Sequence, residues 1–184
     1  MRESVVTARD NDLVRLSLTD PECFAVLFDR HAPHLHAYVA RRLGPDVADD
    51  VVSDTFLDAF RRRHAYDPHR ADARPWLYGI ASNLIGKHRR RETARYRAYT
   101  RSGPDETVAA LVEEGVTTLA VNRPLLRALA ALKPRDRDVL LLVAWAQFTY
   151  DEVAAALSIP AGTVRSRLNR ARTKVRTALE AGDA

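Results

Sequence analysis

The side chains best suited to chemistry lie near the C-terminus of this 184-residue chain, on two segments predicted to be consecutive helices. Thr149 and Glu152 stand three residues apart, the spacing of a capping box that begins a helix. The Ser-Ile-Pro sequence at 158–160 predicts a tight turn, and a second helix is expected from about Ala161. The exposed face of that second helix would carry Arg165, Arg167, Arg170, Arg172, Lys174 and Arg176, with Ser166 and Asn169 among them.

This basic helix has the dimensions and the donors needed to read duplex DNA. An α-helix fits the major groove, where Arg pairs with guanine and Asn with adenine through two hydrogen bonds each. Other cations would neutralise phosphates without reading sequence. A basic helix face is often ordinary solvated surface, but the capped short helix and the turn before it favour a DNA-binding helix-turn-helix. The predicted contact residues are Thr163, Arg165, Ser166, Arg167, Asn169, Arg170, Arg172 and Lys174.

A second candidate site combines aromatic and basic side chains on a predicted helix that begins near Trp76. Aromatic rings stack on unpaired bases while nearby cations hold the backbone, so this combination favours single-stranded DNA. Trp76 taken alone is more often an anchor of the core. The candidate residues are Trp76, Tyr78, Lys87, His88, Arg89, Arg90 and Arg91.

The stretch 46–60 predicts an amphipathic helix with an acidic outer face. Apolar residues such as Val51 and Phe56 recur at helical spacing and predict its inner face. The acidic side is compatible with a solvated surface or with a surface that docks on a partner. Its carboxylates are Asp46, Asp49, Asp50, Asp54 and Asp58.

Metal and enzyme chemistry have weaker support in the sequence. His31 and His34 stand three residues apart on a predicted helix and have the spacing to share a metal, but the single cysteine, Cys23, is not near enough to complete a set. We expect His31 to be a hydrogen-bonded core residue. The sequence has no Gly-rich phosphate loop and no Ser/His/Asp pattern. It therefore predicts no enzymatic activity, no metal, no cofactor and no small-molecule substrate.

Helices are expected to position all of these residues. A first helix is predicted from Asp20 to the Gly-Pro pair at 44–45, and residues 64–75 predict a loop. An acidic stretch interrupted by Gly and Pro follows the basic helix end. The predicted fold is all-α, with two small helical domains at 1–98 and 123–184 joined by a flexible acidic linker at 99–122.

The composition fits a nucleic-acid partner and a cytoplasmic protein. Lys and Arg number 29 against 24 Asp and Glu, a net charge of +5. Basic surface attracts polyanions. No apolar run approaches the ~20 residues of a membrane span, and the N-terminus lacks the apolar core of a signal peptide. We therefore expect no membrane insertion and a cytoplasmic location.

The order of these segments resembles the extracytoplasmic-function (ECF) group of the σ70 family of bacterial RNA polymerase σ factors. The matching stretches are FAVLFDRHAPHLHAYVARRL, ADDVVSDTFLDAFRR, PWLYGIASNLIGKHRRR and YDEVAAALSIPAGTVRSRLNRAR. The resemblance implies a σ2-like bundle of three or four helices followed by a σ4-like helix-turn-helix. It also implies promoter DNA and core RNA polymerase as partners, through the β′ clamp and the β flap, and an anti-σ protein as regulator.

The resemblance implies a role for each candidate surface. The helix at 46–62 would dock on the β′ clamp, with Phe56 beside its carboxylates. The helix at 76–91 would recognise and melt the −10 element, with Asn83 and the loop at 66–74 holding a flipped base. The basic C-terminal helix would read the −35 element. The rival hypothesis is a stand-alone helix-turn-helix regulator whose first domain senses a ligand or dimerises.

Overall fold

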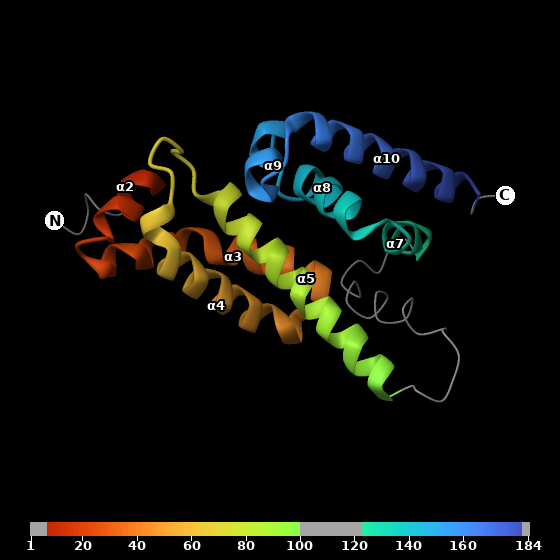
Figure 1. Ribbon diagram of the computed structural model, residues 1–184, viewed down its shortest axis with the longest axis horizontal. Helices are drawn as coiled ribbons and strands as arrows, with labels where there is room; N and C mark the ends of the chain where they lie inside the picture. The colour runs from red at the N-terminus through yellow and green to blue at the C-terminus, as the bar shows by residue number, and fades with distance from the viewer. Residues whose placement is uncertain (1–6, 100–122, 182–184) are drawn as a thin grey trace.

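The computed structural model describes residues 7–99 and 123–181, and every regular element in these ranges is helical. Helices α2 to α5 form one packed unit and α7 to α10 another (Figure 1). The predicted all-α class is therefore confirmed. Apart from the end of α5, the expected acidic linker at 99–122 lies outside the described residues. The elements are α2 (Asp10–Leu16), the 3₁₀ turn η1 (Pro21–Phe24), α3 (Ala25–Leu43), α4 (Pro45–Arg62), η2 (Arg63–Ala65), α5 (Arg74–Tyr99), α7 (Arg123–Ala130), α8 (Pro134–Ala144), α9 (Tyr150–Leu157) and α10 (Ala161–Glu180).

Helices α3, α4 and α5 pack around the core of the first unit. Leu35 from α3 and Leu77 and Ile85 from α5 are fully buried there. Gly44 separates α3 from α4 with φ of 88°, a backbone region that glycine adopts without the strain a Cβ would bring. Pro45 then occupies the first turn of α4, where its missing N–H leaves no hydrogen bond unmade. The Gly-Pro pair thus ends one helix and begins the next, as the sequence predicted.

Two helix starts differ from the sequence-based prediction. The segment begun by Asp20 is the 3₁₀ turn η1, capped by the Asp20 carboxylate, and the α-helix α3 begins after it. Helix α5 begins at Arg74 rather than near Trp76. The Asp72 carboxylate accepts a hydrogen bond from the Arg74 backbone amide at 2.8 Å, which satisfies one of the amides left free at a helix start.

The short helix α2 was not predicted, and the carboxylate of Asp10 fixes its start to the rest of the unit. Asp10 is 5% exposed and accepts hydrogen bonds from Arg30 and from the backbone amide of Ala73. His31 Nε2 lies 2.8 Å from the same carboxylate. Burial raises the pKa of Asp10, but these hydrogen bonds and the charge of His31 outweigh it and hold the pKa below its usual value. His31 is therefore a hydrogen-bonded core residue, as expected.

The second unit contains the predicted helix-turn-helix. The Thr149 hydroxyl accepts a bond from the Glu152 amide at 3.3 Å, and the Glu152 carboxylate accepts one from the Thr149 amide at 2.7 Å. This confirms the predicted capping box at the start of α9. Ser158 ends α9 in the left-handed conformation, with φ of 51°. Val164 and Leu168 then bury the inner side of α10.

The two units meet where α5 packs against α9. A Cβ on Gly79 would lie 2.3 Å from the carbonyl oxygen of Ala156, so this close approach requires glycine. Beside it, the rings of Tyr78 and Phe148 meet edge to face at 5.1 Å. One cluster of buried apolar side chains continues through both units. We call this state, in which the two units are in contact, the closed arrangement.

Candidate nucleic-acid and polymerase interface

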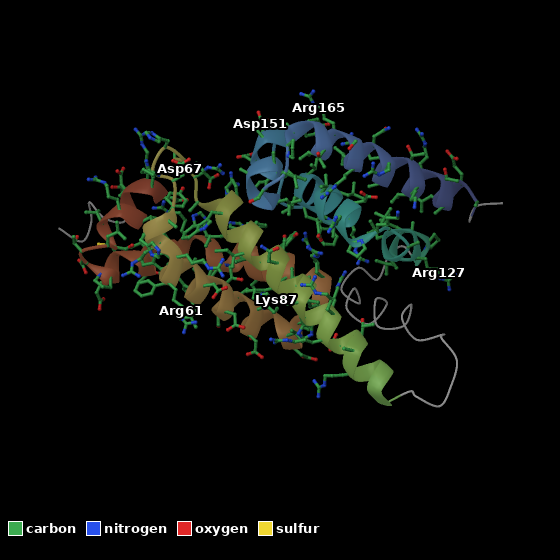
Figure 2. The ribbon with its side chains drawn as sticks, in the orientation of Figure 1. Arg61, Asp67, Lys87, Arg127, Asp151 and Arg165 are labelled. Carbon is green, nitrogen blue, oxygen red and sulfur yellow. The ribbon has the colours of Figure 1, made fainter. Side chains whose placement is uncertain are left out.

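The outer face of α10 carries the residues predicted to read duplex DNA. Val164 and Leu168 bury one side of the helix. At about 100° per residue, Arg165, Ser166 and Asn169 fall within about 100° of one another on the opposite side. All three are exposed, and Figure 2 shows Arg165 directed away from the helical body. The structure thus brings these three together as one accessible surface.

Arg170 has an intramolecular partner that the sequence did not reveal. Its guanidinium donates a hydrogen bond to the Asp136 carboxylate of α8 at 3.1 Å, and Asp136 is only 4% exposed. Arg170 therefore holds α10 against α8 as well as lying at the edge of the basic face. Of the remaining predicted contacts on α10, Thr163 and Arg167 are half-buried and Arg172 and Lys174 are exposed.

The residues predicted to contact single-stranded DNA divide between two faces of α5. Trp76, Asn83, Lys87 and Arg90 fall within about 60° of one another on the outer face. The last three are exposed, whereas Trp76 is half-buried against Tyr66, with ring centroids 4.9 Å apart. The outer face therefore offers an aromatic ring, an amide and two cations in one line.

Tyr78 and Arg89 lie on the other face of α5, towards the second unit. Tyr78 is 5% exposed, and burial, together with its neighbour Tyr38, raises the pKa of Tyr78 to about 12. Arg89 donates a hydrogen bond to the backbone carbonyl of Arg42 at 2.7 Å. In the closed arrangement Tyr78 is thus inaccessible to DNA and Arg89 is already engaged within the chain. Two other predicted residues remain. His88 Nε2 lies 3.4 Å from Glu92 Oε1, and Arg91 is exposed.

Helix α4 presents the acidic surface that the sequence predicted. Asp46, Asp50 and Asp54 are exposed and fall within about 80° of one another around the helix. Asp49 and Asp58 lie at the two margins of this face. Asp49 Oδ1 is 3.2 Å from Nε2 of His36 in α3, and Asp58 Oδ2 is 3.4 Å from Nη2 of Arg62. Three carboxylates therefore share the outward face, and two turn towards neighbours.

Two exposed apolar side chains lie within or beside the acidic face, and the sequence did not predict them. Leu57 is 45% exposed and falls between the outward carboxylates around α4. Phe28 of α3 is 44% exposed and packs edge-on against Phe56, with ring centroids 4.9 Å apart. Phe56, a predicted polymerase contact, is itself 6% exposed and supports Phe28 from below. The sequence did contain a signal for Leu57, because helical spacing places this apolar residue on the exposed side of α4.

Within residues 7–99 and 123–181, no group of three or more His, Cys, Asp or Glu is arranged to hold a metal ion. None of the helices in this part of the chain combines the length and the apolar character needed to cross a membrane.

The chain matches two family models from one family. The model described as “Sigma-70 region 2” matches residues 27–95, and the model described as “Sigma-70, region 4” matches residues 122–175. The first match spans α3, α4 and most of α5, and the second spans the helix-turn-helix unit. The two candidate nucleic-acid surfaces therefore fall in separate regions of the same family.

Curated relatives carry the same family name. The chain is 35% identical to RNA polymerase sigma factor HrpL of Pseudomonas syringae pv. syringae over 79% of this chain and 81% of that protein. It is 31% identical to ECF RNA polymerase sigma factor SigL of Mycobacterium tuberculosis over 84% of this chain and 87% of that protein. These names favour a sigma factor over a stand-alone regulator.

Two solved structures share the fold of this chain. CnrH in complex with the cytosolic domain of CnrY shares 27% identity with this chain at a TM-score of 0.67, over 94% of this chain and 97% of that one. The sigma factor RpoE in complex with the anti-sigma factor NepR, from Bartonella quintana, shares the fold at a TM-score of 0.62 and 22% identity. The two matched regions and the relatives that are 31% and 35% identical show that the chain belongs to the ECF family of RNA polymerase sigma factors.

Proposed function

We propose that three separate surfaces carry out the work of this sigma factor. The outer face of α10 reads the −35 element, the outer face of α5 binds and melts the −10 element, and the acidic face of α4 with Leu57 docks on core polymerase. Residues 1–98 would form the σ2-like domain, 99–122 the linker and 123–184 the σ4-like domain. The polymerase would supply the chemistry of RNA synthesis, in the cytoplasm, and this chain would supply binding.

The outward trio of α10 is the observation on which the −35 assignment depends. Arg165, Ser166 and Asn169 offer guanidinium, hydroxyl and amide groups at the start of a helix of 20 residues. Such groups at the N-terminal part of a helix meet base edges in the major groove. The capping box of α9 and the ion pair between Arg170 and Asp136 fix the helix that presents them.

The closed arrangement cannot engage both promoter elements at once. Elements centred near −10 and −35 lie about 25 base pairs apart, which is about 85 Å of B-DNA. Helix α5 is about 39 Å long, and Gly79 in its N-terminal half lies against Ala156 of α9. We therefore propose that the two units separate when the chain joins polymerase and promoter, which would also uncover Tyr78.

An anti-sigma protein is the proposed regulator. CnrH and RpoE are each known in complex with a partner, and the partner of RpoE is named as an anti-sigma factor. We propose that such a protein covers the acidic and apolar face around Asp50, Leu57 and Phe28, because this surface combines charge with exposed apolar area. Covering it would block docking on the polymerase.

The melting assignment is tested with permanganate, which oxidises unpaired thymines. Polymerase reconstituted with Trp76→Ala and Asn83→Ala together should bind promoter DNA but show at least tenfold lower reactivity in the −10 region. Arg95→Ala is the matched control, because Arg95 is exposed on a different side of α5. Wild-type reactivity in the double variant would remove the outer face of α5 from melting.

A further inference from the structure

Helix α2 is hydrogen-bonded to the loop at 66–73, which joins η2 to α5. The side-chain amide of Asn11 donates a hydrogen bond to the Pro68 carbonyl at 3.0 Å, within the loop. The Asp10 carboxylate accepts one from the backbone amide of Ala73 at 2.9 Å, at the end of the loop. Helix α2 therefore holds the loop at two points, and Figure 1 shows the two segments side by side.

Helix α2 is itself fixed to the rest of the first unit. Leu13 is fully buried, and Val14 is 2% exposed. At the other end of the helix, the Arg63 guanidinium of η2 donates a hydrogen bond to the Ser17 carbonyl at 3.2 Å. Because α2 is anchored in the core and bonded to the turn just before the loop, it can serve as a fixed support for the loop.

The position of the loop determines the surroundings of Trp76. The ring of Tyr66, at the start of the loop, packs on Trp76 with ring centroids 4.9 Å apart. The Tyr66 hydroxyl donates a hydrogen bond to the Arg70 carbonyl at 2.5 Å, and the Asp67 carboxylate accepts one from the His69 amide at 3.0 Å. These bonds join Tyr66 to the loop, so a displacement of the loop would move the ring that supports Trp76.

We propose that Asn11 is a positioning residue for promoter melting, which holds the loop at 66–73 beside the outer face of α5. Its bond to the Pro68 carbonyl keeps the loop, and with it the ring of Tyr66, in the place that supports Trp76. A surface that is already ordered loses less free energy to ordering when an unpaired strand binds to it. This role rests on the proposed function of the outer face of α5 in melting the −10 element.

Asn11 can be changed without disturbing the core, whereas Asp10 cannot. The Asp10 carboxylate is also bonded to two side chains of α3 inside the unit. The bond from Asn11 to Pro68 is exposed, and the Asn11 Oδ1 atom accepts a second bond from the Asp12 amide at 3.0 Å. Asn11→Asp keeps this acceptor and the shape of the side chain, but an ionised carboxylate cannot donate to the Pro68 carbonyl. Asn11→Ala removes the donor without adding a charge.

Two measurements on the full-length chain test the proposal. Hydrogen exchange of the amides at 67–73, followed by mass spectrometry, should be about fivefold faster in Asn11→Ala and Asn11→Asp, as expected for the loss of one hydrogen bond, while exchange in α3 stays unchanged. With polymerase reconstituted from either variant, thymines in the −10 region should become reactive to permanganate about fivefold more slowly, because the loop must then be ordered during melting. Arg15→Ala is the matched control. Arg15 is exposed on α2 and pairs with Asp12 of the same helix, and its loss changes the net charge in the same direction as Asn11→Asp.

The outcomes separate this role from the melting function on which it rests. Unchanged exchange at 67–73 in both Asn11 variants would overturn the proposal, because the bond would then not hold the loop. Faster exchange with melting at the wild-type rate, or equally slow melting in Arg15→Ala, would overturn the positioning role. The melting assignment would survive either result if the Trp76→Ala and Asn83→Ala double variant still failed to open DNA. Normal melting in that double variant would overturn the assignment itself, and the role of Asn11 with it.

Discussion

Asp138→Asn should shift the free protein from the closed arrangement towards separated units. Asp138 pairs with Arg42 across the contact between the units, and the two side chains are 21% and 3% exposed. Removing one partner of a buried ion pair costs about 3–5 kcal/mol. Because Asp138 is partly solvated, we take about 2 kcal/mol, which changes the ratio of closed to open molecules by about 30-fold. The change also removes the carboxylate whose charge favours the nearby guanidinium groups of Arg89 and Arg137, which acts in the same direction.

Single-molecule energy transfer between dyes on the two units measures this ratio. Thr19 in the first unit and Thr177 in the second are exposed and suit labelling as cysteines, after Cys23 is replaced by Ala. Asp138→Asn should deplete the high-transfer population, whereas Asp151→Asn, which removes an exposed carboxylate from α9, should not. Identical distributions in wild type and Asp138→Asn would refute the ion pair as a determinant of closure.

A steric change at a separate point gives an independent check on the same equilibrium. Gly79→Ala places a Cβ 2.3 Å from the Ala156 carbonyl oxygen, so the contact between α5 and α9 must move apart. Alanine also favours helix over glycine by about 1 kcal/mol, so α5 itself should not unfold. Opening by this neutral substitution, measured with the same dye pair, would show that packing between α5 and α9 contributes to closure independently of the ion pair between Arg42 and Asp138.

Three further changes test the two proposed surfaces and the buried carboxylate of Asp10. Arg165→Ala should cost about 1–3 kcal/mol on one preferred −35 sequence and relax the preference at one base pair, measured by polymerase binding to −35 variants; equal loss on every sequence would make Arg165 a phosphate contact. Asp50→Arg with Asp54→Arg should abolish co-purification with core polymerase while circular dichroism stays unchanged, and retained binding would contradict the docking face. Asp10, whose pKa is lowered in the folded chain, should stabilise the fold fully above its unfolded pKa near 3.8 and progressively less as the pH falls through the lower folded value. Asp10→Asn should therefore flatten the dependence of unfolding free energy on pH below about pH 4, and an unchanged slope would contradict that role.

Local signals in the sequence were sufficient for the major helices. The Gly-Pro pair at 44–45 marks the break between α3 and α4, and Thr149 with Glu152 marks the start of α9, because caps and breakers act within a few residues. The helical spacing of apolar residues likewise identified the buried sides of α4 and α10. These features depend on near neighbours in the chain, which a sequence displays directly.

Features set by distant contacts could not be predicted in this way. Helix α2 has seven residues, too few for a periodic pattern, and depends on the bonds of Asp10 to residues 20 or more positions away. Tyr78 and Arg89 read as surface residues beside a basic run, yet Tyr78 packs on Phe148 of the second unit and Arg89 donates a hydrogen bond to the Arg42 carbonyl. The hydrogen bond from Arg170 to Asp136 joins residues on two helices, and the pattern of residues along either helix does not indicate it. The sequence therefore predicted the helices on which the candidate residues lie, but not which of their side chains the closed arrangement hides.

Run-off transcription tests the central claim most directly. Core RNA polymerase is combined with the purified chain and a library of promoter fragments that vary in the −10 and −35 elements, and transcript start sites are sequenced. The account predicts transcripts that begin at defined positions only when the chain is present, with separate sequence preferences at the two elements. Start sites that are unchanged by addition of the chain would contradict its assignment as the subunit that selects promoters.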